Sequence, residues 1–278
     1  MSKDKIKVGI LCICLNPPYW EFSKEMLEGL ERYFLKGHDI KDKYSVEMML
    51  WSDMPETNYN VKNLKIFNTE PVEWPLPTLL RYNLFLQQEE YIKNFDYLFY
   101  IDVDMRITDW IGEEILGNGL TAAQHPMYAL RRNLIPPYED NPESTAYISR
   151  PGRTLEERND KGEIVNIRFE PLYYAGGFQG GKTEDFIKAM KVMRNNTEKD
   201  FNNNYIAKWN DESHWNRYLY EVSPIVVLSP AYIYPDSLIA EYYVKIWGRN
   251  YSPKIMTLTK KFSTTIEGGV AIQKLIAM

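Results

Sequence analysis

The sequence predicts an α/β fold with a mostly parallel central sheet and helices packed on its faces. Strand and helix patterns alternate along the first half of the chain, as parallel sheets require. Residues 96–104, DYLFYIDVD, form a strand without alternation of apolar and polar side chains, which indicates burial on both faces. Asp102 and Asp104 stand at its carboxyl end, the edge where such sheets bind ligands.

The first half contains well-marked elements. The apolar run KIKVGILCICL is typical of a buried strand, and NPPY breaks it. Apolar residues then recur at helical spacing until Gly37. A proline opens a second helix with an apolar face. The predicted elements are strand 5–15, helix 20–37, strands 44–53 and 64–70, helix 77–95 and strand 96–104.

Beyond residue 110 the pattern is less regular. The polar, turn-rich segment 149–168 predicts an exposed hairpin or a mobile loop. We expect one domain over 1–260, with a nucleotide-binding half at about 1–110, an acceptor-binding half at about 111–247 and a flexible tail over 248–278. The predicted elements are strands 118–126 and 172–181, helices 182–201 and 210–222, and strand 223–235.

Composition and charge narrow the class of function. The 278 residues are 44% hydrophobic and 26% charged, which is ordinary for a globular protein. The net charge of −5 argues against a nucleic-acid partner, which needs a basic surface. Cys12 and Cys14 lie two apart on one strand and are poorly placed to form a disulfide. Because no apolar stretch reaches the length of a membrane span, we expect a soluble, cytoplasmic protein.

The Asp-x-Asp pair is the first candidate site. Two carboxylates are costly to hold side by side unless a positive charge lies between them. A divalent metal ion that carries a phosphorylated ligand would supply that charge. The motif alone is weak, and its position after a buried strand is what favours metal binding.

Residues 208–219, KWNDESHWNRYL, are the second candidate. They predict the start of a helix with Asn210 or Asp211 as its cap. A helix N-terminus lowers the pKa of a nearby carboxylate, so we expect Glu212 to be ionised and available as a base, nucleophile or ion-pair partner. Trp209 is placed to pack against the apolar face of a sugar ring.

Two other features have alternative interpretations. The stretch YYAGGFQGG carries two glycine pairs, which fit either close approach of the backbone to a bulky ligand or a plain turn. His125 is one of three histidines, and a lone histidine is either structural or catalytic.

Six stretches occur in a characteristic order along the chain: DYLFYIDVDM, QHPMY, STAYI, YYAGGFQGG, WNDESHWNRYL and VLSPAYIYP. Together they resemble glycosyltransferase family 6, which includes the histo-blood-group A and B transferases and α1,3-galactosyltransferase. The resemblance extends from about residue 6 to about residue 260. It implies a GT-A fold and a retaining, Mn²⁺-dependent transfer of galactose or N-acetylgalactosamine from a UDP-sugar to O3 of a β-galactoside.

The resemblance also implies roles for individual residues. Asp102 and Asp104 resemble the metal- and donor-binding aspartates, and Arg81 resembles the arginine that supports the first of them. Glu212 resembles the carboxylate that attacks or stabilises the anomeric centre, beside the acceptor. The other donor-side residues are Tyr19 near the uracil, Ala175, Gly176 and Gly177 at the sugar C2 substituent, Asp211 on the sugar, and Lys254 and Lys260 on the diphosphate; His125 and Trp209 are the acceptor-side residues.

The chain also differs from the family pattern. It resembles the bacterial and phage members, which lack the membrane anchor of vertebrate members, but it keeps the Asp-x-Asp pair that some bacterial relatives lose. Asn210 stands where the family has a histidine, and the segment 149–168 is longer than expected near the acceptor side. Small residues at 175–177 leave space for an acetamido group, so we expect N-acetylgalactosamine to be preferred over galactose. The acceptor is expected to be a β-galactoside, fucosylated or not.

Two other functions share parts of this pattern. A metal-dependent phosphohydrolase of the haloacid dehalogenase type also uses Asp-x-Asp after a strand. Such enzymes usually place it on the first strand and follow it with Thr or Val where this chain has Arg106. A non-catalytic sugar-binding module is the other alternative, and the intact carboxylates at 102, 104, 211 and 212 argue against it.

Overall fold

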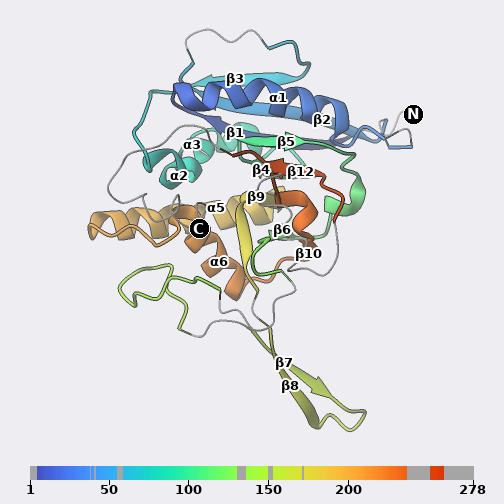
Figure 1. Cartoon of the computed structure of the whole chain (residues 1–278), viewed down its shortest axis with the longest axis vertical. Helices are drawn as coiled ribbons and strands as arrows, with labels where there is room; N and C mark the ends of the chain where they lie inside the picture. The colour runs from blue at the N-terminus through green and yellow to red at the C-terminus, as the bar shows by residue number, and fades with distance from the viewer. Residues whose placement is uncertain are drawn as a thin grey trace.

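Figure 1 shows a computed structural model of the chain, in which a layered α/β body carries a hairpin that projects from one end. A seven-stranded sheet runs through the body, and two smaller sheets accompany it. The described residues are 5–37, 39–40, 42–54, 59–129, 136–149, 153–170, 172–236 and 251–259.

The central sheet has the strand order β10-β6-β9-β4-β1-β2-β3. All neighbours are parallel except on the two sides of β9, which is antiparallel to both β4 and β6. The predicted mostly parallel sheet is therefore confirmed. Its strands are β1 (Ile6–Cys14), β2 (Tyr44–Ser52), β3 (Leu64–Asn68), β4 (Tyr97–Ile101), β6 (Leu120–Gln124), β9 (Tyr174–Lys182) and β10 (Val226–Leu228).

Helices cover both faces of this sheet. Because successive side chains of a strand point to opposite faces, β1 contributes to two cores. Ile10 lies in the cluster under one helix, whereas Leu11 lies in the cluster under three others. The first cluster contains residues of α1 (Pro17–Tyr33); the second contains residues of α3 (Arg81–Leu86), α5 (Thr183–Asn202) and α6 (Asn210–Glu221).

Helix α1 differs from its predicted bounds at both ends. It begins at Pro17 rather than residue 20, because a proline is well tolerated in the first turn, where its missing N–H needs no partner. It ends at Tyr33 rather than near Gly37, because Phe34 forms a β-bridge with Ile111.

The prediction of a single helix over 77–95 is wrong. Three short helices replace it: α2 (Leu76–Leu79), α3 and α4 (Glu89–Ile92). Leu80 separates the first two with a backbone at φ −92° and ψ 0°, outside the helical range. The break places Arg81 at the start of its own helix.

The described part of the tail after residue 248 contains regular structure. Residues 251–259 contain β12 (Ile255–Thr257), which pairs with β5 (Met105–Ile107) and β11 (Tyr234–Pro235). Ile255 is fully buried, so this pairing is part of the core. A flexible tail is therefore the wrong description of 251–259.

The segment 149–168 contains an antiparallel hairpin, one of the two forms predicted for it. Strands β7 (Arg153–Arg158) and β8 (Ile164–Glu170) form it, and it extends away from the body in Figure 1. Two 3₁₀ turns, η1 (Glu113–Ile115) and η2 (Pro230–Ile233), complete the described elements. Within the described ranges, no helix has the length and apolar character that crossing a membrane requires.

Candidate active site

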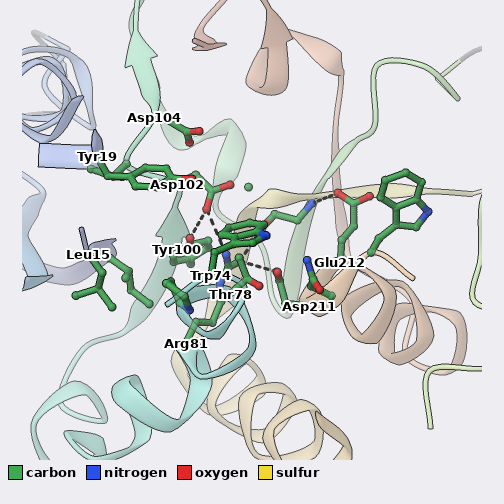
Figure 2. Close-up of a pocket in the computed structure, with 17 residues that line it drawn as sticks. Leu15, Tyr19, Trp74, Thr78, Arg81, Tyr100, Asp102, Asp104, Asp211 and Glu212 are labelled. Atoms are coloured by element: carbon green, nitrogen blue, oxygen red, sulfur yellow. Dashed lines mark hydrogen bonds and ion pairs between the residues drawn. The ribbon is translucent and has the colours of Figure 1, made fainter. Parts of the chain in front are cut away.

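A pocket of about 330 Å³ lies at the carboxyl ends of β1 and β4, beside the glycines of β9. Sheets of this kind bind ligands at this edge. Figure 2 shows the residues that line the pocket. They are Ile13, Leu15, Tyr19, Trp74, Pro77, Thr78, Arg81, Tyr100, Asp102, Val103, Asp104, Gly176, Gly177, Trp209, Asn210, Asp211 and Glu212.

The two aspartates follow β4 directly. The strand ends at Ile101, and the Asp102 N–H then donates to the Gly177 carbonyl (3.0 Å). The Asp102 Oδ1 accepts hydrogen bonds from the Tyr100 hydroxyl and from Arg81 Nη2 (3.3 Å). The structure therefore brings the Asp102 carboxylate to the pocket with one oxygen already engaged by protein, and Asp104 lines the same pocket.

Arg81 is the centre of a buried charge network, with only 4% of the residue exposed. Its Nη1 donates to Asp211 Oδ2 (2.6 Å) and to the Gly176 carbonyl (3.3 Å), and its Nη2 reaches Asp102. Its guanidinium also lies over the Tyr100 ring, 4.1 Å from the ring centre. Burial alone would lower the pKa of Arg81. The negative charges around it, Asp211 above all, outweigh this effect and raise the pKa. Arg81 is thus a fixed cation that holds two carboxylates.

Helix α6 carries Asp211 and Glu212 in its first turn. Its cap is Trp209, not Asn210 or Asp211, and the Trp209 N–H donates to Ser213 Oγ (3.0 Å). Asn210 has φ 49°, a left-handed conformation that asparagine tolerates better than most residues.

The two carboxyl groups of this turn are less acidic than the sequence suggested. Burial raises the pKa of Glu212 to about 7, and the hydrogen bond from the Gly176 N–H (2.7 Å) together with the nearby Tyr173 hydroxyl only partly offsets this effect. Burial likewise raises the pKa of Asp211 to about 7, against the pull of Arg81. The expectation that the helix N-terminus keeps the Glu212 pKa low is therefore wrong, because desolvation is the larger effect.

The glycines of β9 bring backbone into the pocket. A Cβ atom at position 176 would lie 3.1 Å from the Glu212 Cβ, and one at position 177 would lie 2.7 Å from Asp102 Oδ2. Glycine at 177 therefore leaves room for the Asp102 carboxylate. Ala175, by contrast, does not line the pocket and packs in the core under α1.

Tyr19 lines the pocket from the first turn of α1. Asp53 fixes the loop that precedes this helix, because its carboxylate accepts from the Asn16 N–H (3.0 Å) and from Trp20 Nε1 (2.8 Å). Asn16 has φ 74°, which residues other than glycine rarely adopt. Strain of this kind persists only where neighbours hold the backbone in place, and here it is held next to a site.

The two predicted acceptor-side residues are separated. Trp209 lines the pocket, whereas His125 does not. The His125 ring packs with Tyr173 and Tyr128, at centre-to-centre distances of 5.6 and 5.2 Å, and its Nδ1 accepts from the Met127 N–H (3.2 Å). Burial lowers the pKa of His125 to about 4, so it is neutral at pH 7.

Lys254 is not brought to the pocket either. Its Nζ lies 2.7 Å from Glu114 Oε1 and donates to the Trp110 carbonyl (2.5 Å). Lys260 lies outside the described residues.

Sequence reasoning missed several residues that line the pocket. Tyr100 had a usable signal, because it stands two residues before Asp102 and side chains at this spacing share a face of a strand. Trp74 and Thr78 had none, since they lie at or beside the irregular start of α2 and become pocket residues only through the fold.

The fold and this site define a glycosyltransferase of the GT-A type: a mostly parallel sheet, two aspartates beyond a central strand, and buried carboxyl groups facing them. Residues 1–248 match the model of glycosyltransferase family 6, and the chain belongs to that family. Family membership argues against the alternative of a phosphohydrolase of the haloacid dehalogenase type.

Curated relatives agree with this assignment. The chain is 31% identical to the histo-blood group ABO system transferase 1 of Rattus norvegicus over 225 residues, which cover 80% of this chain and 59% of the relative. It is 29% identical to the O-antigen biosynthesis glycosyltransferase WbnI of Escherichia coli over 200 residues, 72% and 74% of the two chains. It is 27% identical to the globoside alpha-1,3-N-acetylgalactosaminyltransferase 1 of Homo sapiens over 240 residues, 83% and 62%. The chain thus spans about three fifths of the two animal relatives.

Proposed function

We propose that this chain transfers N-acetylgalactosamine, or galactose more slowly, from its UDP-sugar to O3 of a β-galactoside, with retention and an α1,3 linkage. The convergence of Asp102, Asp104, Asp211 and Glu212 on one pocket carries the proposal. The names of relatives add support, since the human protein is an α1,3-N-acetylgalactosaminyltransferase and the rat protein an ABO transferase.

The pocket suits a divalent cation that arrives with a phosphorylated donor, and Mn²⁺ is the ion we propose. The carboxylates of Asp102 and Asp104 line the pocket on the side of β4, and Oδ2 of Asp102 occupies space that any side chain at Gly177 would invade. Among the described residues, no group of three or more His, Cys, Asp or Glu side chains could hold a metal ion alone. Two carboxylates plus substrate phosphates are a common ligand set for such ions. When bound, the ion would neutralise the diphosphate and ease its departure.

The residues around the aspartates would orient the donor. Arg81 bonds to Asp102 through Nη2 and to Asp211 through Nη1 (Figure 2), so both carboxylates are set before a ligand binds. In the proposed complex Tyr19 packs on the uracil, Asp211 bonds to sugar hydroxyls, and Trp209 packs on a sugar ring.

Glu212 would act at the anomeric carbon in one of two ways. In the first, a carboxylate oxygen bonds to this carbon while the bond to the diphosphate breaks, and UDP leaves with the electron pair. The acceptor O3 then displaces Glu212 and gives its proton to the diphosphate. In the second, Glu212 stays unbonded and stabilises the positive charge on the ring, while O3 attacks from the face that UDP leaves and again gives its proton to the diphosphate. Both routes require the carboxyl group of Glu212 to be ionised.

A non-catalytic sugar-binding module is the remaining alternative. Binding alone does not require two carboxyl groups whose pKa values burial raises to about 7, whereas perturbed groups of this kind cluster in active sites.

One assay tests the proposal. The purified chain is incubated with Mn²⁺, lactose-type acceptors with and without fucose, and each of the UDP-activated forms of galactose, N-acetylgalactosamine, glucose and N-acetylglucosamine. We expect transfer from the two galacto-configured donors, and NMR should show an α1,3 linkage in the product. Transfer only from the gluco-configured donors, or a β linkage, would overturn the donor assignment or the stereochemistry. Tight UDP-sugar binding without any transfer would favour the binding module.

A further inference from the structure

Strand β9 contains a bulge next to the pocket. The register moves by two positions along β6, from Ala122 to Gln124, but by five along β9, from Gln179 back to Tyr174. A bulge re-aims the strand but leaves backbone groups without ladder partners. The glycines at 176 and 177, which lie in this bulge, are the β9 residues that line the pocket.

A buried glutamine closes the bulge. Gln179 is fully buried and does not line the pocket. Its Nε2 donates to the Gly176 carbonyl (3.0 Å), and its Oε1 accepts from the Tyr82 hydroxyl (2.7 Å). Tyr82 is also fully buried. Because a carbonyl oxygen can only accept, the amide must present its NH₂ group to Gly176, and the Tyr82 hydroxyl then donates to the other end.

The backbone of Gly176 also reaches Glu212. The Gly176 carbonyl accepts from Gln179 and from Arg81 Nη1, while the Gly176 N–H, which belongs to the preceding peptide group, donates to Glu212 Oε2 (2.7 Å). Asn216 clamps the other end of the bulge, since its side-chain amide exchanges two hydrogen bonds of 2.8 Å with the Tyr174 backbone. The orientation of Glu212 therefore depends on Gly176, whose backbone N–H and carbonyl are bonded to side chains and not to the sheet ladder.

We propose that Gln179, oriented by Tyr82, is a positioning residue for the transfer reaction, because it fixes the Gly176 carbonyl and thereby the backbone conformation of the residue whose N–H holds Glu212. The inference rests on the proposed role of Glu212. An apolar side chain would suit the surrounding core, which contains Phe85, Phe186 and Trp215, so packing alone does not account for a buried amide at this position. Its two hydrogen bonds do account for it.

The test compares three variants of the full chain. Gln179→Met keeps the side-chain length and removes the donor, and Tyr82→Phe removes only the hydroxyl. Thr121→Val is the matched control, because it removes another buried side-chain hydrogen bond, to the Ile115 carbonyl (2.9 Å), on the neighbouring strand and outside the pocket.

We expect kcat to fall about tenfold in Gln179→Met and about threefold in Tyr82→Phe, with the donor KM nearly unchanged, because orientation in the transition state is what is lost. The rising limb of the pH–rate profile should move to higher pH, since Glu212 loses a fixed N–H donor. Thr121→Val should change neither quantity. Activity in Gln179→Met within twofold of the wild type, with an unmoved profile, would overturn the inference.

A second measurement does not depend on activity. In protein labelled with ¹⁵N-glycine, hydrogen exchange of the Gly176 amide should be about tenfold faster in Gln179→Met than in wild type, and unchanged in Thr121→Val. Equal exchange rates in the wild type, Gln179→Met and Thr121→Val would refute the claim that Gln179 holds the backbone of Gly176 in place. If the wild type transfers no sugar, the proposed function fails, and the exchange measurement still decides whether Gln179 holds Gly176.

Discussion

The inner wall and the rim of the pocket are built in different ways. The inner wall consists of Arg81, Gly176, Asp211 and Glu212, whose charged and polar atoms are bonded to one another. The rim consists of Tyr19, in the first turn of α1, and Asp104, on the turn after β4. Residues outside the pocket hold both: Asp53 fixes the loop before α1, and the Leu258 N–H donates to the Asp104 carbonyl (3.0 Å). The inner wall is therefore set by bonds among its own residues, whereas the rim is held from outside the pocket.

This difference assigns different tasks to the two regions. A preorganised group costs no reorganisation at the moment of reaction, so the inner wall suits the chemical step. The partly exposed carboxylate of Asp104 at the rim suits an ion that comes and goes with its phosphates. Variants of the rim should therefore lose donor binding, and variants of the inner wall should lose rate.

The largest effect is expected at the rim. Removal of Mn²⁺ by EDTA, or the substitution Asp104→Ala, should lower transfer more than about a thousandfold and weaken UDP-sugar binding, because the diphosphate charge is no longer neutralised. Turnover and calorimetric binding of UDP are the measurements. Asp109→Ala, an exposed aspartate outside the pocket, is the control and should behave as the wild type. Full activity in chelator would refute the metal role of both aspartates.

The inner wall gives the next largest effect. Glu212→Gln keeps the shape and the acceptor for the Gly176 N–H but removes the charge, so kcat should fall by a factor of about a hundred to a thousand. UDP affinity should change less than twofold, in contrast to Asp104→Ala. Glu221→Gln, at the exposed end of the same helix, controls for the loss of a carboxylate. A near-normal rate in Glu212→Gln would remove Glu212 from the chemistry.

The contrast also shows what the sequence predicts and what it does not. The strand before Asp102 and the helix that begins just before Glu212 follow from local patterns, so the sequence placed both carboxylates on the correct elements. The break at Leu80 has no glycine or proline as a signal, and the pairing of Lys254 with Glu114 joins residues 140 apart. Local patterns carry no information on such contacts. The raised pKa of Glu212 was missed for the same reason, because burial is a property of the assembled fold.

The third prediction concerns stability. A carboxyl group with an ordinary unfolded pKa near 4.5 and a folded pKa of about 7 binds more protons in the folded state between these values, so the free energy of unfolding falls as pH rises through this window. For Glu212 the loss is up to about 3 kcal/mol by pH 7. Glu212→Gln cannot ionise, so its stability relative to wild type should increase from pH 4.5 to 7 and be constant above.

Urea unfolding without donor, at several pH values, measures this difference. Glu221→Gln should show no such trend. A difference between Glu212→Gln and wild type that does not depend on pH would mean that Glu212 is not desolvated in the free enzyme, and the account of the inner wall as a desolvated, preorganised region would be wrong.

The smallest expected effect is on donor preference, and it separates the role of Gly176 from that of Gly177. Space at Gly176 and Gly177 should admit an acetamido group, but empty space rejects a smaller sugar only weakly. We therefore expect UDP-N-acetylgalactosamine to be preferred over UDP-galactose by less than about tenfold in kcat/KM.

A methyl group at 176 would enter the space beside Glu212, whereas one at 177 would meet Asp102 Oδ2. Gly176→Ala should therefore reduce the preference for the larger sugar while both donors still bind, and Gly177→Ala should weaken binding of both by displacing Asp102. The ratio of kcat/KM for the two donors in each variant is the measurement. If UDP-galactose is clearly preferred by the wild type, pocket volume does not set the choice, and if the two variants behave alike, the two glycines do not have the separate roles that their neighbours indicate.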